Sequence, residues 1–269
     1  TVGNRNLSDC VACPAGFYCP DEGMTNGSVY ACDAGFFCPA GMSVRSQFDF
    51  TCPVGSYCSG SHGFPIPCSP GYFQPTAGSS FCIPCPLGFF CPGIMSVIPS
   101  TVYNDSFMLP CPAGTFCPLG SAYPRQCLPG TYSSRLAAPN CSSCPPGYIC
   151  KDFGISDYVN ATVYSGMNSQ CLDAFASAMR VFGMLRANRT IVEGTIPANP
   201  CYKNPKIDYT CPIGHFCPAG LRNLEAGRCP RGTFSDTTGI GDILQCRPCL
   251  PGMFCVEPGL SAPTGLCSG

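Results

Sequence analysis

Apolar residues recur at helical spacing in one stretch of the 269-residue sequence, between Cys171 and Cys201. Alanines fill several of the intervening positions, and Ser169 stands where a helix N-cap is expected. This pattern predicts a helix over about residues 170–187, with an apolar stripe along one face. The stripe consists of Leu172, Phe175, Met179, Phe182 and Leu185.

Elsewhere the apolar positions follow a short repeated unit, Cys-x-x-Gly-x-aromatic. We call each copy a head and name it by its first cysteine. Every head keeps the glycine, which favours a turn with positive φ, and Ile149 is the one exception to the aromatic. The pattern predicts short strands, turns and coil, with each ring serving as an apolar plate over a disulfide or the next unit. The heads begin at Cys13, Cys32, Cys52, Cys68, Cys85, Cys111, Cys127, Cys144, Cys211, Cys229 and Cys249.

The heads end in two ways. Closed heads have a second cysteine six residues after the first, as in Cys85 and Cys91. Open heads lack it and run on to a Cys-x-x-Cys step that leads into the next head. Because this loop recurs wherever the closing cysteine is missing, we predict the disulfides Cys68–Cys82, Cys127–Cys141 and Cys229–Cys246, while the pairing in closed heads stays open.

A longer period is superimposed on the heads. The cysteine spacing from Cys68 to Cys91 recurs unchanged from Cys127 to Cys150, and in looser form from Cys229 to Cys255. Repeats of this kind indicate tandem modules. We expect cysteine-rich repeats over residues 1–67, 68–126, 127–168 and 209–269, with a helical insert over residues 169–208.

The composition is that of a disulfide scaffold, with 26 Cys, 31 Gly and 30 Pro and no Trp. The other apolar residues are too few for one large core, so we expect a long, thin chain stabilised by cross-links. An even cysteine count is consistent with complete pairing and no free thiol, in an oxidising compartment. Zinc is the competing interpretation of the Cys-x-x-Cys steps, but the chain has only His62 and His215 as histidine ligands.

Sequons for N-glycosylation also indicate an exterior location. Three of them, at Asn26, Asn104 and Asn160, lie in the gap after a closed head, where an exposed loop is expected. Asn140 stands beside Cys141, and Asn188 stands at the predicted helix end. The full set is Asn6, Asn26, Asn104, Asn140, Asn160 and Asn188.

Several function classes are disfavoured. Net charge is −1 with scattered basic residues, which gives no nucleic-acid footprint. No apolar run is long enough to span a membrane, and the sequence begins without Met or a signal peptide, so we expect a processed or partial chain. His62 and His215 lack a partner nucleophile motif, and we expect neither catalysis nor a cofactor or bound metal.

The heads resemble the ephrin-receptor-like cysteine-rich repeat, also called the GCC2/GCC3 repeat. Cys127-Leu-Pro-Gly-Thr-Tyr-Ser133 and Cys229-Pro-Arg-Gly-Thr-Phe-Ser235 carry the resemblance most clearly. The doubled form Cys-Pro-Ala-Gly-Thr-Phe-Cys-Pro is similar to large surface proteins of protists and algae, including mastigoneme-type flagellar coats. The resemblance implies small disulfide-rich repeats, built as elongated tandem modules of the EGF-like or tumour-necrosis-factor-receptor-like kind. It also implies an extracellular setting.

Two functions fit these observations. The first is a glycosylated extracellular structural protein that forms a filament, sheath or flagellar hair, with copies of itself or other coat proteins as partners. The second is a receptor or adhesin ectodomain that binds an external protein or glycan. The helix, through its stripe, either folds back over the heads near Cys150 and Cys211, held by a Cys171–Cys201 bridge, or docks on a neighbouring subunit.

Overall fold

The computed structural model describes residues 12–21, 30–45, 48–93, 108–157 and 209–268, together with the backbone of 163–164 and 202–203. Their contacts divide the chain into two units. Unit 1 contains residues 1–85, 91–109 and 120–122. Unit 2 contains residues 86–90, 110–119 and 123–269. The predicted helix and its flanking Cys171 and Cys201 lie outside the described residues.

Unit 1 is built from short hairpins and single bridges. Strand β1 (Ser56–Tyr57) pairs with β2 (Ile66–Pro67), and β3 (Tyr72–Phe73) pairs with β4 (Ile83–Pro84), both antiparallel. Isolated bridges join Phe17 to Ala31 and Phe36 to Thr51. A 3-10 turn, η3, covers Phe48–Phe50. Strand β6 (Leu109–Pro110) lies where the two units divide.

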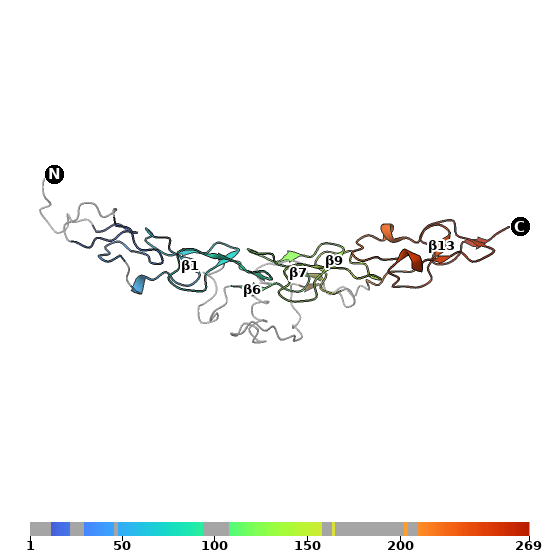
Figure 1. The fold of residues 1–269 in the computed structure, drawn as a ribbon, viewed down its shortest axis with the longest axis horizontal. Coiled ribbons are helices and arrows are strands. Elements are labelled where there is room, and N and C mark those ends of the chain that lie inside the picture. The colour runs from blue at the N-terminus through green and yellow to red at the C-terminus, as the bar shows by residue number, and fades with distance from the viewer. Residues whose placement is uncertain are drawn as a thin grey trace. The chain divides into compact units, whose positions relative to one another are not determined.

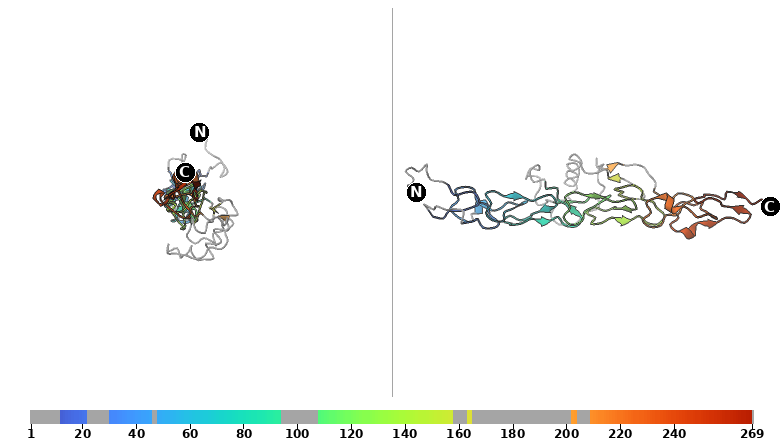
Figure 2. Two further views of the ribbon diagram at one scale, coloured as in Figure 1. Left: turned by 90° about the vertical axis from the view of Figure 1, so that its right-hand side faces the viewer. Right: turned by 90° about the horizontal axis from the view of Figure 1, so that it is seen from above.

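Unit 2 repeats this construction (Figures 1 and 2). Isolated bridges join Tyr148 to Thr210 and His215 to Arg228. The antiparallel pairs are β7 (Thr115–Phe116) with β8 (Arg125–Gln126), β9 (Thr131–Tyr132) with β10 (Ser142–Ser143), β11 (Val163–Tyr164) with β12 (Tyr202–Lys203), β13 (Thr233–Phe234) with β14 (Arg247–Pro248), and β15 (Met253–Phe254) with β16 (Gly265–Leu266). Strand β5 (Phe89–Phe90) and the 3-10 turns η4 (Leu224–Gly227) and η5 (Ile243–Gln245) complete the described elements.

One register underlies these hairpins. The residue after the head glycine pairs with the residue just before the next head, as in Ser56 with Pro67 and Thr233 with Pro248. Tyr148 and Thr210 hold the same two positions although their heads, Cys144 and Cys211, are far apart in sequence. The loop between paired positions therefore varies in length while the register stays constant.

Disulfides take the place of a common core. Most half-cystines are buried, and small apolar clusters form around them instead of one large interior. This arrangement, with short two-stranded hairpins and no long helix among the coloured residues of Figure 2, is a set of small disulfide-rich tandem modules. That part of the predicted fold class is confirmed.

Candidate functional site

Successive heads are joined by a fixed set of four main-chain hydrogen bonds, which we call the junction. Between the Cys144 and Cys211 heads, Gly147 both donates to and accepts from the following head. Two more bonds link the turn after the second head to the two ends of the first. The bonds run from Gly147 N–H to Cys217 O (2.8 Å), from Cys211 N–H to Gly147 O (2.9 Å), from Gly220 N–H to Cys144 O (2.8 Å) and from Cys150 N–H to Leu221 O (3.3 Å).

The junction recurs in both units. Since all donors and acceptors are main-chain groups, its geometry makes little demand on side chains and tolerates loops of different length. In unit 1 it joins the Cys13 head to Cys32 and the Cys52 head to Cys68. In unit 2 it joins Cys111 to Cys127, Cys127 to Cys144, Cys144 to Cys211, Cys211 to Cys229, and Cys229 to Cys249.

The apolar part of the junction is the ring of one head lying against the disulfide of the next. Tyr132 of the Cys127 head packs on the cluster around Cys144 and Cys150. Phe216 of the Cys211 head packs in the same way on the cluster around Cys229 and Cys246. In these junctions the aromatic ring of one head thus covers the disulfide of the next, which compensates for the absence of a large core.

The head glycine is required by both conformation and space. Gly130 and Gly147 have φ values of +88° and +86°, which favour glycine. A Cβ atom on Gly130 would lie 2.6 Å from the carbonyl oxygen of Gly220, which belongs to the second head along the chain. The Cys127 head therefore contacts not only its neighbour but also the head after that.

A second position with positive φ was missed by the sequence analysis. It follows the first cysteine of a head by nine or ten residues, as at Gly220 (φ +76°) and Gly239 (φ +74°). At both positions the N–H donates to the carbonyl oxygen of the first cysteine of the preceding head. The carbonyl oxygen of each lies against the head glycine two heads back. Ser61 (φ +56°) and Ala137 (φ +55°) take this conformation without being glycine. A search for a second recurring glycine would have found the position.

In each described closed head the first and second cysteines form a disulfide with each other, and this answers the pairing that the sequence left open. Cysteines six residues apart are bonded in the heads at Cys13, Cys32, Cys52, Cys85, Cys111, Cys144, Cys211 and Cys249. In the open heads the structure joins Cys68 to Cys82, Cys127 to Cys141 and Cys229 to Cys246, the three pairs named from the sequence.

The cysteines of each described Cys-x-x-Cys step belong to different disulfides, as Cys82 and Cys85 do. Because each of these cysteines is oxidised in a disulfide, it offers no thiolate to zinc, and the described residues hold no cluster of three or more metal-ligating side chains. Within the same ranges, no helix has the length and apolar character needed to cross a membrane.

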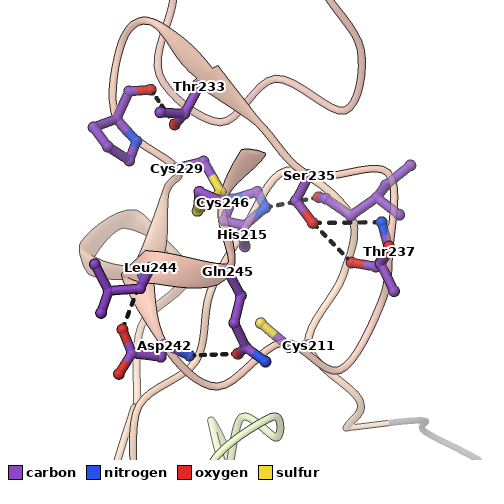
Figure 3. The surroundings of a disulfide bond; sticks show 12 residues. Cys211, His215, Cys229, Thr233, Ser235, Thr237, Asp242, Leu244, Gln245 and Cys246 are labelled. Atoms are coloured by element: carbon purple, nitrogen blue, oxygen red, sulfur yellow. Dashed lines mark hydrogen bonds between the residues drawn. A yellow bond between two sulfur atoms is a disulfide. The ribbon is translucent and has the colours of Figure 1, made fainter. Parts of the chain in front are cut away.

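Open heads carry a buried polar side chain where closed heads have their second cysteine. These residues are Gln74, Ser133 and Ser235. The Ser235 hydroxyl donates to the carbonyl oxygen of Thr237 at 3.0 Å, close to the Cys229–Cys246 bridge (Figure 3). Gln74 donates to the carbonyl oxygen of Phe81 at 2.7 Å. A hydrogen bond thus fixes the turn where a disulfide is lacking.

The third open head carries a capped 3-10 turn, η5, in its enlarged loop. Asp242 accepts from the N–H of Leu244 at 2.9 Å, and Gln245 accepts from the N–H of Asp242 at 2.9 Å (Figure 3). This is a capping box, which rigidifies the turn. Leu244 stands on it with 89% of its surface exposed, so an apolar side chain is held in solvent on a rigid support.

The residues that flank the long loop between the Cys144 and Cys211 heads are held together by a buried cluster and a hydrogen bond. Tyr209 is fully buried, and its hydroxyl donates to Oδ2 of Asp152 at 2.7 Å. Ile149 N–H donates to the Tyr209 carbonyl oxygen at 2.8 Å, and Ile155 completes the cluster. Burial, followed by the hydrogen bond to Asp152 and its negative charge, raises the pKa of Tyr209 far above its usual range. The described residues on the two sides of this segment are therefore held together by a buried cluster and by a hydrogen bond.

Of the predicted glycosylation sites, Asn140 is the one that falls within the described residues. It is exposed, in a bend before β10 and beside the Cys127–Cys141 bridge. Outside the described residues lie Asn6, Asn26, Asn104, Asn160 and Asn188. The predicted assembly stripe, Leu172, Phe175, Met179, Phe182 and Leu185, and the predicted Cys171–Cys201 bridge also lie outside them.

The two histidines contact nearby carbonyl groups. Nδ1 of His62 lies 2.6 Å from the carbonyl oxygen of Gly60, and Nδ1 of His215 lies 3.0 Å from that of Ile213. Since a carbonyl can only accept, Nδ1 carries the proton in each ring. The hydroxyl of Ser59, 3.5 Å from Nδ1 of His62, therefore faces a donor and not a base.

The expectation of complete cysteine pairing is wrong at Cys267. This residue is exposed and has no disulfide. Its N–H donates to the carbonyl oxygen of Gly252 at 2.8 Å, the bond that the first cysteine of each head from Cys32 onward makes to the glycine of the preceding head. In its main-chain hydrogen bond, Cys267 thus matches the first cysteine of a head. An even cysteine count is therefore compatible with a cysteine that has no disulfide.

Comparison with known families agrees with this construction. Residues 55–100, which span the Cys68 and Cys85 heads, match the family model described as tyrosine-protein kinase ephrin type A/B receptor-like. The chain carries ephrin-receptor-like cysteine-rich repeats. A search of curated proteins found none that matches the chain. The ephrin-receptor-like repeats and their many disulfides indicate an extracellular location.

Proposed function

We propose that the protein is an extracellular, glycosylated structural repeat protein that forms a filament, sheath or flagellar hair of the mastigoneme type. The observation that carries this proposal is the junction. Its bonds join main-chain groups and its apolar contact is one ring on one disulfide, so heads of differing sequence follow one another with the same geometry. A unit that adds to itself in this way suits a structural element better than a single binding site.

Surface chemistry supports the same proposal. The chain is poor in charge, and its described ion pairs, such as Arg247 with Asp236, are exposed and contribute little to stability. Asn140, exposed beside a rigid disulfide, offers a site at which a glycan projects without disturbing the fold. We propose glycans there and at the other sequons, and no catalytic role.

The proposed partners are copies of the same chain or other extracellular coat proteins. Electron microscopy of the purified chain tests this proposal. Ordered fibres with a regular axial repeat are the expected result. Discrete particles at all concentrations, with glycans and disulfides intact, would overturn the filament and leave the second function.

That second function is a receptor or adhesin ectodomain, and one observation favours it. Leu244 is held in solvent on a capped turn, as an anchor for an external protein would be. If the chain acts in this way, Leu244→Asp abolishes binding to cells that bind the native chain, while Leu128→Asp, at another exposed leucine, does not. Equal binding by both variants contradicts an anchoring role for this residue.

A further inference from the structure

We propose that the repeat is an extensible element whose maximum length is set by its disulfides. Tension opens the junctions between heads, and each disulfide withholds a fixed length of chain until it is reduced. This property belongs to the single chain and does not depend on filament formation.

The first support is where the covalent and non-covalent links lie. All eleven described disulfides are local, with sequence separations of 6, 14 or 17, and each closes a loop within one head or one hairpin. No described bridge connects a closed head to its successor. Successive heads are held together by the main-chain bonds of the junction and by one ring packed on a disulfide. Force along the chain therefore meets non-covalent contacts first.

The second support is that closed and open heads withhold different lengths. In the Cys211 head the bridged Cα atoms are 5.8 Å apart, whereas the same six-residue step spans about 21 Å when extended. The bridge therefore withholds about 15 Å. In the Cys229 head the Cα atoms are also 5.8 Å apart across a separation of 17, so about 54 Å is withheld.

The two kinds of head therefore behave differently when their junctions open. In a closed head the loop between the second cysteine and the next head lies outside the disulfide. Opening the junction therefore lets this loop extend. An open head encloses nearly the whole hairpin: only Ile83 and Pro84 separate Cys82 from the Cys85 head. Extension in the oxidised chain is therefore concentrated at junctions that follow closed heads.

Reduction converts the withheld length into free length. A small dithiol attacks one sulfur of the bridge and is itself oxidised to a cyclic disulfide, while the bridge takes up two electrons and two protons and becomes two thiols. Opening the junction exposes bridges such as Cys211–Cys217, which are buried in the folded chain. We therefore expect dithiol to act faster on a stretched chain than on a relaxed one.

Force spectroscopy on the full chain, with handles at both termini, tests the proposal. In the oxidised chain we expect repeated openings at forces well below those that break covalent bonds. Dithiol added after extension should then lengthen the chain by at least about 260 Å from the described bridges, in steps of about 15, 43 and 54 Å. A single all-or-none opening, or an unchanged contour length after reduction, overturns the proposal.

Two matched variants show which disulfide produces which step in length. Cys211→Ser with Cys217→Ser should lengthen the unreduced chain by about 15 Å, and Cys229→Ser with Cys246→Ser by about 54 Å. Equal increments from both variants contradict the proposed loops. If either variant fails to fold, the steps seen on reducing the folded native chain decide the matter, because no substitution is involved.

Discussion

A Cβ atom placed on Gly147 would lie 2.5 Å from the carbonyl oxygen of Gly239, two heads further along the chain. Gly239 lies in a main-chain turn, and its own N–H donates a hydrogen bond to the carbonyl oxygen of Cys211. The clash therefore cannot be relieved by rotating a side chain. The repeat depends on this absence of a side chain as much as on its cysteines.

Gly147→Ala should destabilise unit 2 by roughly 2–5 kcal/mol, from the positive φ and from the displaced turn together. The matched control is Gly232→Ala, because Gly232 has φ +82° but nothing within 4 Å of a Cβ atom. There the loss should be about 1–2 kcal/mol, from the backbone conformation alone. Denaturant unfolding measures both, and equal losses would show that the space between heads is irrelevant.

The second positive-φ position predicts a stabilising change. Ala137 has φ +55° where most equivalent positions are glycine. Ala137→Gly removes the steric cost of the left-handed conformation but increases the entropy of the unfolded chain, so we expect a net gain of about 0.5–1 kcal/mol. Ala138→Gly, next to it and buried, is the control and should destabilise. A loss of stability in Ala137→Gly contradicts the assigned role of the turn.

The sequence predicts what depends on residue type. Its heads, their turns and the bridge from Cys68 to Cys82 follow from glycine and cysteine spacing, because only these residues meet the local geometric demand. The junction could not be predicted in the same way, since bonds between main-chain groups leave no signature in side chains. The sequence also did not show that the Cys144 head is joined to the Cys211 head. The two heads keep the usual strand register although many residues separate them, and sequence separation alone does not reveal a register.

Tyr209→Phe tests the clasp at the base of the long loop. Loss of the bond from the tyrosine hydroxyl to Asp152 should cost about 1.5–3 kcal/mol, typical of a hydrogen bond to a charged group. The raised pKa of Tyr209 also fixes the sign of a pH dependence. Below pH of about 10 its contribution is fully present, and it is lost above that pH as the unfolded chain ionises and the folded chain does not.

Urea unfolding of the native chain and the variant at pH 8 and pH 11 measures both effects. The difference in stability between native and Tyr209→Phe should shrink at the higher pH, because phenylalanine does not ionise. Tyr72→Phe, at an exposed tyrosine, is the control and should behave as the native chain does. A difference that stays constant with pH would argue against a buried, hydrogen-bonded Tyr209.

Cys267 predicts a reactive thiol in the folded chain. It is exposed and without a disulfide, so iodoacetamide should label it under native conditions without reductant. Mass spectrometry of the digested chain locates the label, and Cys267→Ser should remove it. Labelling at Cys211 or Cys229 under the same conditions would instead mean that the bridges of the repeat are incomplete.

The last prediction separates the repeat from the long loop it carries. Tyr164 and Tyr202 pair across β11 and β12, so their backbones are close enough to be joined by a short linker. The junction between the Cys144 and Cys211 heads, and the hydrogen bond between Asp152 and Tyr209, involve no residue between Tyr164 and Tyr202. Replacing residues 165–201 with Gly-Asn-Gly-Gly should therefore leave the described disulfides of unit 2 and the thermal midpoint of the repeat unchanged.

The same replacement decides what the predicted stripe does. If Phe175 and Phe182 dock on a neighbouring subunit, the shortened chain is secreted and folded but forms no fibres. Charged replacement of these two residues in the full chain then has the same effect, because either change removes the apolar contact. If the stripe instead covers the heads near Cys150 and Cys211, both changes impair folding or secretion. Fibres that persist after both changes exclude docking through this stripe.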